Sequence, residues 1–144
     1  MDSPAPKVTL TNADKVLYPE TGTTKADVFD YYTAIAEVMV PHIAGRPATR
    51  KRWPNGVDRP SFFEKQLASS APDWLGRGAV VHKSGTTTYP VIDSVAGLAW
   101  IAQQASLEVH VPQWRFVSGV PGPATRLVFD LDPGAGVSMS QLCE

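Results

Sequence analysis

Two carboxylates stand two residues apart directly after the most apolar stretch of the sequence. The stretch Arg126–Leu131 predicts a strand in the centre of a sheet, because nearly all of its side chains are apolar. Asp130 and Asp132 would then share one face, since side chains alternate along a strand. Two such carboxylates can bind hard divalent cations, and a pair of cations can activate a hydroxyl and hold a leaving pyrophosphate in nucleotidyl transfer. The alternative is that Asp132-Pro133-Gly134 forms a turn and Asp130 is a paired or edge-exposed acid.

Two lysines flank a second candidate site near the start of the chain. Lys15 follows the turn-prone Asn12-Ala13-Asp14, and Lys25 lies where a helix is expected to begin, with Thr24 as its cap and Asp27 three residues on. A helix start favours an anion, because its first backbone N–H groups are unpaired and the helix dipole is positive there. For any pair of lysines, a solvated surface is the alternative.

A basic strand and an aromatic pair form a third group. Ala48–Trp53 is predicted to be a strand with a basic face that carries Lys51 and Arg52, for which a solvated surface is again the alternative. Phe62 and Phe63 would point in opposite directions if their segment is extended. One ring could therefore pack in the core while the other stays available for a ligand.

The elements that position these residues follow from hydrophobic periodicity. One long helix is expected from Thr24, with a buried stripe formed by Val28, Tyr32, Ile35 and Met39. Ser94 is expected to cap a second helix, whose inward positions are Val95, Leu98, Ala102 and Ala105.

Strand patterns complete the set. A hairpin is predicted around Ser84-Gly85-Thr86, and short strands are predicted at Val8–Thr11 and Leu107–Val111. The latter carries His110, a lone histidine for which a structural role is the alternative. A helical pattern begins at Val137. Helices and strands without strict alternation indicate an α+β fold, with a mixed or antiparallel sheet and flanking helices.

Composition narrows the class of protein. With 43% hydrophobic and 19% charged residues in 144, the chain is typical of one globular domain, here residues 7–144 after a disordered leader at 1–6. The net charge of −1 argues against a histone-like protein. The single Cys143 allows no internal disulfide, and no apolar run is long enough for a membrane span or a signal peptide, so we expect a cytoplasmic protein.

Long runs of sequence carry a family resemblance. The segments VTLTNADKVLYPETGTTKADVFDYY, HIAGRPATRKRWPNGVDRPSFFEKQ, SGTTTYPVIDSVAGLAWIAQQASLEVHVPQWRF and ATRLVFDLDPG resemble the polymerase domain of bacterial ligase D, of the archaeo-eukaryotic primase superfamily. They cover nearly the whole chain from Lys7, and such runs are far more specific than an isolated Asp-x-Asp. The resemblance implies the front half of a primase-polymerase fold.

The resemblance also implies functions for particular residues. Asp130 and Asp132 would be catalytic ligands of Mn²⁺ or Mg²⁺, and the pocket for the 5′-phosphate of a downstream DNA strand would comprise Asn12, Lys15 and Lys25. Residues near the nucleotide and template would be Lys51, Arg52, Phe62, Phe63 and His110. The loop Lys83–Tyr89 resembles one used in pairing two DNA ends, and an ordinary hairpin is the alternative. Implied partners are 5′-phosphorylated DNA, NTPs or dNTPs, Ku, and the ligase and nuclease domains, all in non-homologous end joining at the nucleoid.

The family domain is about twice as long as this chain. Its second half contributes a third metal-binding carboxylate and a Ser-Gly-rich motif that holds the phosphates of the nucleotide, and the connection VSGVPG is shorter than in close relatives. The leading hypothesis is therefore a DNA-end-recognition portion of an end-joining polymerase, catalytic when completed by its second half. The rivals are an autonomous, non-catalytic module that binds 5′-phosphorylated ends, and a plain α+β domain with no nucleic-acid role.

Overall fold

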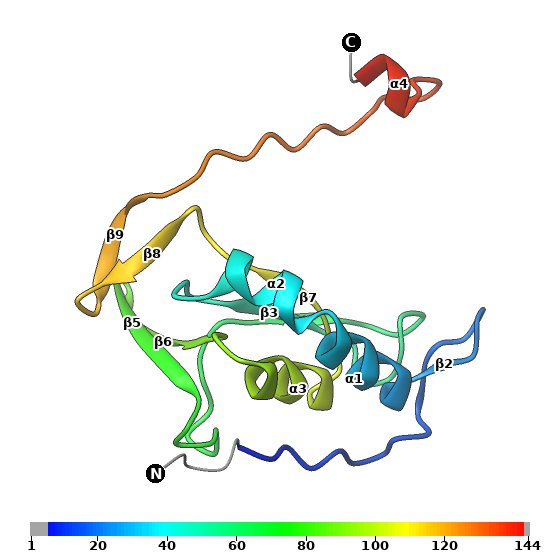
Figure 1. The fold of residues 1–144 in the computed structure, drawn as a ribbon, viewed down its shortest axis with the longest axis horizontal. Helices are drawn as coiled ribbons and strands as arrows, with labels where there is room; N and C mark the ends of the chain where they lie inside the picture. Colours follow the sequence, from blue (N-terminus) through cyan, green and yellow to red (C-terminus); the bar gives the residue numbers. More distant parts are fainter. Residues whose placement is uncertain (1–5, 143–144) are drawn as a thin grey trace.

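The described part of the chain folds into four small antiparallel sheets and a layer of helices (Figure 1). The computed structural model describes residues 6–142, so part of the expected leader and Cys143 lie outside the described residues. The elements are β1 (Val16–Tyr18), β2 (Thr23–Thr24), α1 (Lys25–Ala34), α2 (Ala36–Ile43), β3 (Thr49–Arg52), β4 (Phe62–Glu64), β5 (Gly76–His82), β6 (Gly85–Val91), α3 (Val95–Gln103), β7 (Ser106–His110), β8 (Trp114–Val117), β9 (Val120–Ala124) and α4 (Met139–Leu142). The α+β prediction is confirmed.

The first helix begins where the sequence predicts. Thr24 Oγ1 accepts a hydrogen bond from the Asp27 N–H at 3.2 Å, and the Asp27 carboxylate accepts from the Thr24 N–H at 2.7 Å. This capping box fixes the start of α1, and the bonds from Thr24 lower the pKa of Asp27. The expected single long helix is wrong, because the chain breaks at Ile35 into α1 and α2. The Thr33 hydroxyl lies within bonding distance of Phe29 O and Asp30 O, the kind of back-bonding that bends helices.

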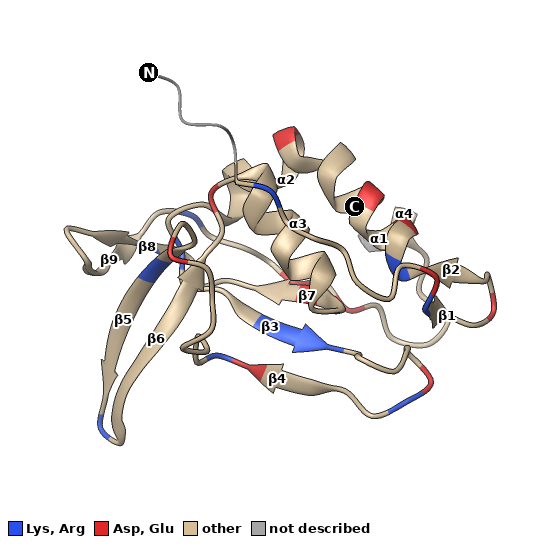
Figure 2. Cartoon of the chain, turned by 90° about the horizontal axis from the view of Figure 1, so that it is seen from below, with Lys and Arg blue, Asp and Glu red and all other residues tan. Residues whose placement is uncertain are grey.

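The central sheet has the order β4–β3–β7, and its two faces differ. The register pairs Lys51 with Phe63 and Glu108, and Thr49 with His110. Because side chains alternate, these residues share one face, here called the outer face. Arg50 points to the opposite, helix-facing side, where its guanidinium lies 4.9 Å from the Trp100 ring of α3. Figure 2 shows the helices gathered on that side of the sheet.

Helix α3 forms the centre of the core. Ser94 caps it by accepting from the Gly97 N–H at 3.2 Å, as predicted. Leu98, Ile101 and Ala102 are fully buried, whereas Val95 is half exposed, so its predicted inward position is wrong. None of the helices in residues 6–142 is long and apolar enough to cross a membrane.

Two hairpins flank the central sheet. The predicted hairpin is present as β5–β6, and its Pro90 O accepts from the Ala48 N–H at 2.9 Å, which ties it to the start of β3. The second hairpin, β8–β9, was not predicted. It packs on the first through Phe116, which fills the space above Gly78.

The predicted central strand Arg126–Leu131 is wrong. From Thr125 the chain runs in extended form away from the body as far as α4 (Figure 1), without strand pairing. Leu127 and Phe129 are each 77% exposed. A strand requires backbone partners, and within residues 6–142 no neighbouring strand edge supplies them. The expected strand at Val8–Thr11 is likewise irregular, because Thr11 instead bonds the Gln103 side chain.

Candidate nucleic-acid interface

A cationic pocket lies where the N-terminal loop, the start of α1 and the end of β3 meet. Its cavity of about 250 Å³ is lined by Asn12, Lys15, Lys25 and Arg52, with the C-terminal end of α3 as its floor. The three residues predicted for a phosphate site are thus brought together. Arg52, which the sequence analysis placed near the nucleotide or template, lies in the same pocket.

The loop that carries Asn12 and Lys15 is fixed by local and long-range bonds. Asn12 adopts a positive φ of 52°, which an asparagine tolerates, and Asn12 O accepts from the Lys15 N–H at 3.1 Å. Thr11 and Gln103 exchange two hydrogen bonds, of 2.9 and 2.7 Å. The pocket is therefore anchored to α3 and is not formed by a free loop.

The two lysines of the pocket hold positive charge without a matching carboxylate. Lys25 is only 6% exposed, and its ammonium donates to Thr11 O at 2.9 Å. Lys15 donates to Asn55 Oδ1 at 3.0 Å. Within the described part of the chain neither lysine forms an ion pair, and burial, followed by the charges of Lys15 and Arg52, lowers the pKa of Lys25. An anion in this cavity would relieve that repulsion.

The expected contribution of free backbone amides at the helix start is wrong. The Lys25 N–H donates to Lys15 O at 2.8 Å, the Ala26 N–H to Ala13 O at 3.0 Å, and the Asp27 N–H to Thr24. The amides of the first turn are thus already used. Any anion here must be bound by side chains and by the dipole of α1.

Arg52 connects this pocket to the aromatic pair. Its guanidinium donates to Gln104 O and to Glu64, each at 2.9 Å, and lies 5.3 Å from the Phe62 ring. Phe62 is 45% exposed and Phe63 58%, so the core alternative is wrong for both rings. Phe62 lies beside the cationic pocket, and Phe63 lies on the outer face.

The outer face carries a connected set of charged and aromatic groups. The Lys51 ammonium lies 4.7 Å from the Trp53 ring and 5.4 Å from the Phe63 ring, and it pairs with Glu108 at 3.2 Å. Glu108 also contacts His110 at 2.7 Å, and the bonds from His110 and then Lys51 lower the pKa of Glu108. The His110 ring stands edge-on to Phe63 at 5.5 Å. The face therefore offers an exposed ring with cationic neighbours, the arrangement of a base-stacking platform.

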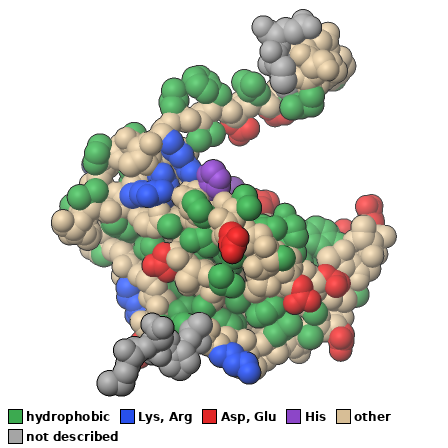
Figure 3. All heavy atoms as spheres, viewed as in Figure 1, with side chains coloured by type: hydrophobic (Ala, Val, Ile, Leu, Met, Phe, Trp, Pro, Cys, Tyr) green, Lys and Arg blue, Asp and Glu red, His purple; other side chains and the backbone are tan. Residues whose placement is uncertain are grey.

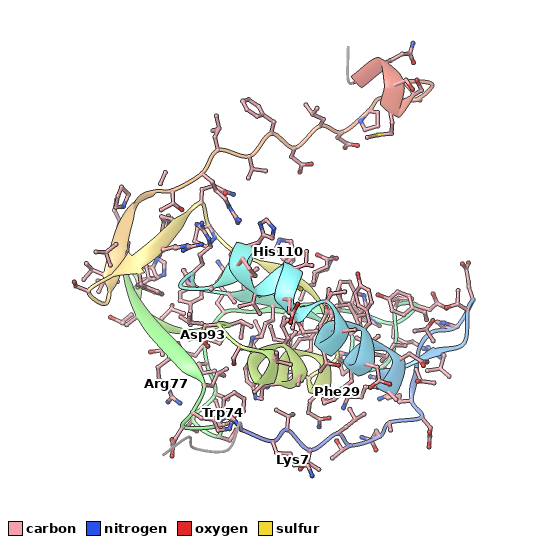
Figure 4. The ribbon with its side chains drawn as sticks, viewed as in Figure 1. Lys7, Phe29, Trp74, Arg77, Asp93 and His110 are labelled. Atoms are coloured by element: carbon pink, nitrogen blue, oxygen red, sulfur yellow. The ribbon has the colours of Figure 1, made fainter. Side chains whose placement is uncertain are left out.

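A second cavity, of about 260 Å³, adjoins the outer face and was not predicted. His110, Lys65 and Trp114 line one side of it, and Val80, His82 and Tyr89 of the hairpin line the other. Figure 4 shows His110 on the margin of the body that faces the extended segment. These residues come from five separate strands or loops, so no local sequence pattern could have identified them.

Asp130 and Asp132 lie apart from these sites. Both are exposed on the extended segment, and no group of three or more potential metal ligands occurs in residues 6–142. Figure 3 shows Lys, Arg and His side chains gathered at the foot of this segment. Two oxygen-donor carboxylates suit Mn²⁺ or Mg²⁺ chemically, but they do not form a closed ligand set here.

Comparison with known proteins identifies relatives that all belong to one family. The model of the family described as LigD, primase-polymerase domain, matches residues 24–144. The multifunctional non-homologous end joining DNA repair protein LigD of Mycobacterium tuberculosis H37Rv is 77% identical over 144 residues, covering 96% of this chain and 19% of that protein. The bifunctional non-homologous end joining protein LigD of Bacillus subtilis 168 is 30% identical over 128 residues, covering 89% and 20% respectively.

A solved structure has the same fold. The polymerase domain from Mycobacterium tuberculosis ligase D in complex with DNA superimposes with a TM-score of 0.90 at 77% identity, covering 94% of this chain and 50% of that one. The present chain therefore spans about a fifth of the length of these curated relatives and half of the solved polymerase domain.

Proposed function

The chain belongs to the LigD primase-polymerase domain family, and on that basis we propose that it recognises DNA ends that carry a 5′-phosphate. The observation that carries this proposal is the cationic pocket, in which Lys15, Lys25 and Arg52 surround one cavity and the two lysines lack ion-pair partners within residues 6–142. The setting is DNA repair by non-homologous end joining, in the cytoplasm at the nucleoid.

A terminal phosphate fits this pocket better than an internal one. It carries more charge and an additional free oxygen, so it can accept bonds from two ammonium groups and from the Asn12 amide together. An internal phosphodiester has strand on both sides and cannot enter a cavity of this size end-on. The pocket is thus suited to recognising a DNA end. Other contacts with the DNA backbone would be the same at any position along the duplex.

The outer face is the proposed region for nucleotide and template. Phe63 and Lys51 supply an exposed ring and a cation, and His110 lies beside them. In the complete domain these groups would serve addition of NTPs or dNTPs, with Asp130 and Asp132 among the ligands of Mn²⁺ or Mg²⁺. Ku and the ligase and nuclease domains are proposed partners of the longer protein.

The first test compares two duplexes that differ in one group. We expect the 144-residue chain to bind a recessed end with a 5′-phosphate about ten-fold more tightly than the same end with a 5′-hydroxyl, because charge-assisted bonds contribute about 1.5–3 kcal/mol each and less when lysines are exposed. Fluorescence anisotropy at one stated salt concentration measures both affinities. Equal affinity for the two ends would contradict the pocket.

The second test concerns the carboxylates. We expect Asp130 and Asp132 to bind Mn²⁺ weakly, because two oxygen donors without further ligands leave most of the coordination to water. In an NMR titration, paramagnetic broadening should reach the signals of these two residues first and should be absent from Asp130→Asn/Asp132→Asn. Broadening that is centred elsewhere would contradict the assignment.

One observation favours a second candidate function. The cationic pocket is formed by described residues, whereas Asp130 and Asp132 lie on a segment where those residues form no group of three or more potential metal ligands. An autonomous, non-catalytic module for 5′-phosphorylated ends would need only the pocket. Phosphate preference without any Mn²⁺ response at the two carboxylates would favour this module over the polymerase.

A further inference from the structure

The cavity between the β5–β6 hairpin and the central sheet has features that the proposed 5′-phosphate function does not use. Its walls combine the rings of Tyr89 and Trp114 with the apolar Val80. Its polar groups are the imidazoles of His82 and His110 and the ammonium of Lys65. We infer that this cavity binds a single unpaired nucleobase of a DNA strand that crosses the outer face.

The size of the cavity limits the ligand. Cavities for drug-sized ligands are typically about 300–1,000 Å³, so a volume of about 260 Å³ is enough for one ring system and too small for a base pair. Trp114 is held in place by an edge-on contact with Phe116 at 5.4 Å, and Phe116 packs against Gly78 of β5. Packing against the β5–β6 hairpin therefore fixes the position of the Trp114 ring without a ligand.

The charge of the lining excludes several ligand classes. None of the described residues that line the cavity is a carboxylate, so the cavity is unsuited to a hard cation such as Mg²⁺ or Ca²⁺ and to an amine. The imidazoles and the Tyr89 hydroxyl can donate to or accept from the polar edge of a base, and His82 Nε2 lies 3.5 Å from that hydroxyl. Lys65 at the rim can meet the phosphate of the same nucleotide.

The cavity is continuous with the stacking platform. The His110 ring lines it and also stands edge-on to Phe63, with 5.5 Å between centroids. A strand with one base on Phe63 would therefore present a neighbouring base at the cavity. We expect this binding to depend little on the base sequence of the strand, because every base has a face that can stack on a ring.

The experiment uses short single strands with a 5′-hydroxyl, so that no terminal phosphate is available for the cationic pocket. Affinities of the 144-residue chain for hexathymidylate and for an abasic hexamer with the same backbone are measured by anisotropy. We expect wild type to prefer hexathymidylate about five-fold, the lower end of the effect of stacking one base. His82→Ala and Trp114→Leu should each reduce this ratio at least two-fold.

The matched control is Val81→Ala, since Val81 follows Val80 on β5 but points away from the cavity and is exposed. Its ratio should equal that of wild type. An unchanged ratio in His82→Ala overturns the inference even if Trp114→Leu fails to fold, because the exposed His82 can be replaced without loss of packing. Failure of the 5′-phosphate proposal would appear only in the duplex comparison, so the two results are independent.

Discussion

Arg50→Ala is expected to destabilise the fold by about 3 kcal/mol and to lower Tm by about 10 °C. Arg50 is 1% exposed, although it is one of the basic residues of β3. Its guanidinium pairs with Glu64 at 3.2 Å, bonds the Gln104 side chain and Gln66 O, and lies over Trp100. Alanine leaves these acceptors unpaired and opens a cavity between β3 and α3.

Two further variants separate charge from packing. Arg50→Met retains an unbranched apolar side chain but loses the hydrogen bonds, so its Tm should fall between those of wild type and Arg50→Ala. Arg59→Ala serves as the surface control, because Arg59 is exposed and has no side-chain bond among the described residues. Thermal unfolding followed by circular dichroism checks the series. Equal Tm values for Arg50→Ala and Arg59→Ala would show that the buried network does not stabilise the sheet.

The double variant Lys15→Met/Lys25→Met is expected to bind the phosphorylated duplex end about twenty-fold more weakly than wild type. About ten-fold of this comes from the terminal phosphate, and about two-fold from the loss of two positive charges near DNA. Methionine is chosen because the stem of Lys25 is buried and should be preserved. The preference for phosphate over hydroxyl should fall close to one.

Lys7→Met is the matched control, since Lys7 is an exposed lysine that does not line the pocket (Figure 4). Its affinity for the phosphorylated duplex should fall at most two-fold, from the loss of charge. Its preference for the 5′-phosphate over the 5′-hydroxyl should equal that of wild type. Anisotropy with the same two duplexes gives both numbers. If the double variant kept its preference, the phosphate would have to bind at another site.

Elements with a complete local signal were predictable from the sequence. Thr24 and Asp27 specify the start of α1, Ser94 specifies the start of α3, and the turn before Gly85 specifies the hairpin, because the atoms that stabilise each feature lie within a few residues. Strand β4 has only three residues, and it forms because β3 lies beside it. The residues that it pairs with lie ten to fourteen positions earlier in the chain, so no periodicity in its own sequence could reveal the strand.

The segment Arg126–Leu131 shows the reverse case. Its apolar side chains are typical of a central strand. A strand also needs a neighbouring strand to pair with its backbone N–H and C=O groups, and the composition of the segment does not show whether one is present. In the candidate site, the grouping of Asn12, Lys15 and Lys25 agrees with the resemblance. The position of Arg52 beside them could not be predicted, because it depends on which face of β3 meets α3.

The extended segment also affects how readily copies of the chain associate with one another. Leu127, Val128 and Phe129 are exposed side by side, a short β-prone run of the kind that seeds intermolecular cross-β association. Asp130, Asp132 and Pro133 follow at once, and charges and proline at the end of such a run act as gatekeepers against it. We therefore expect the two carboxylates to oppose this association whether or not they bind metal. Neutralising them removes that protection, so light scattering belongs beside every titration of Asp130→Asn/Asp132→Asn.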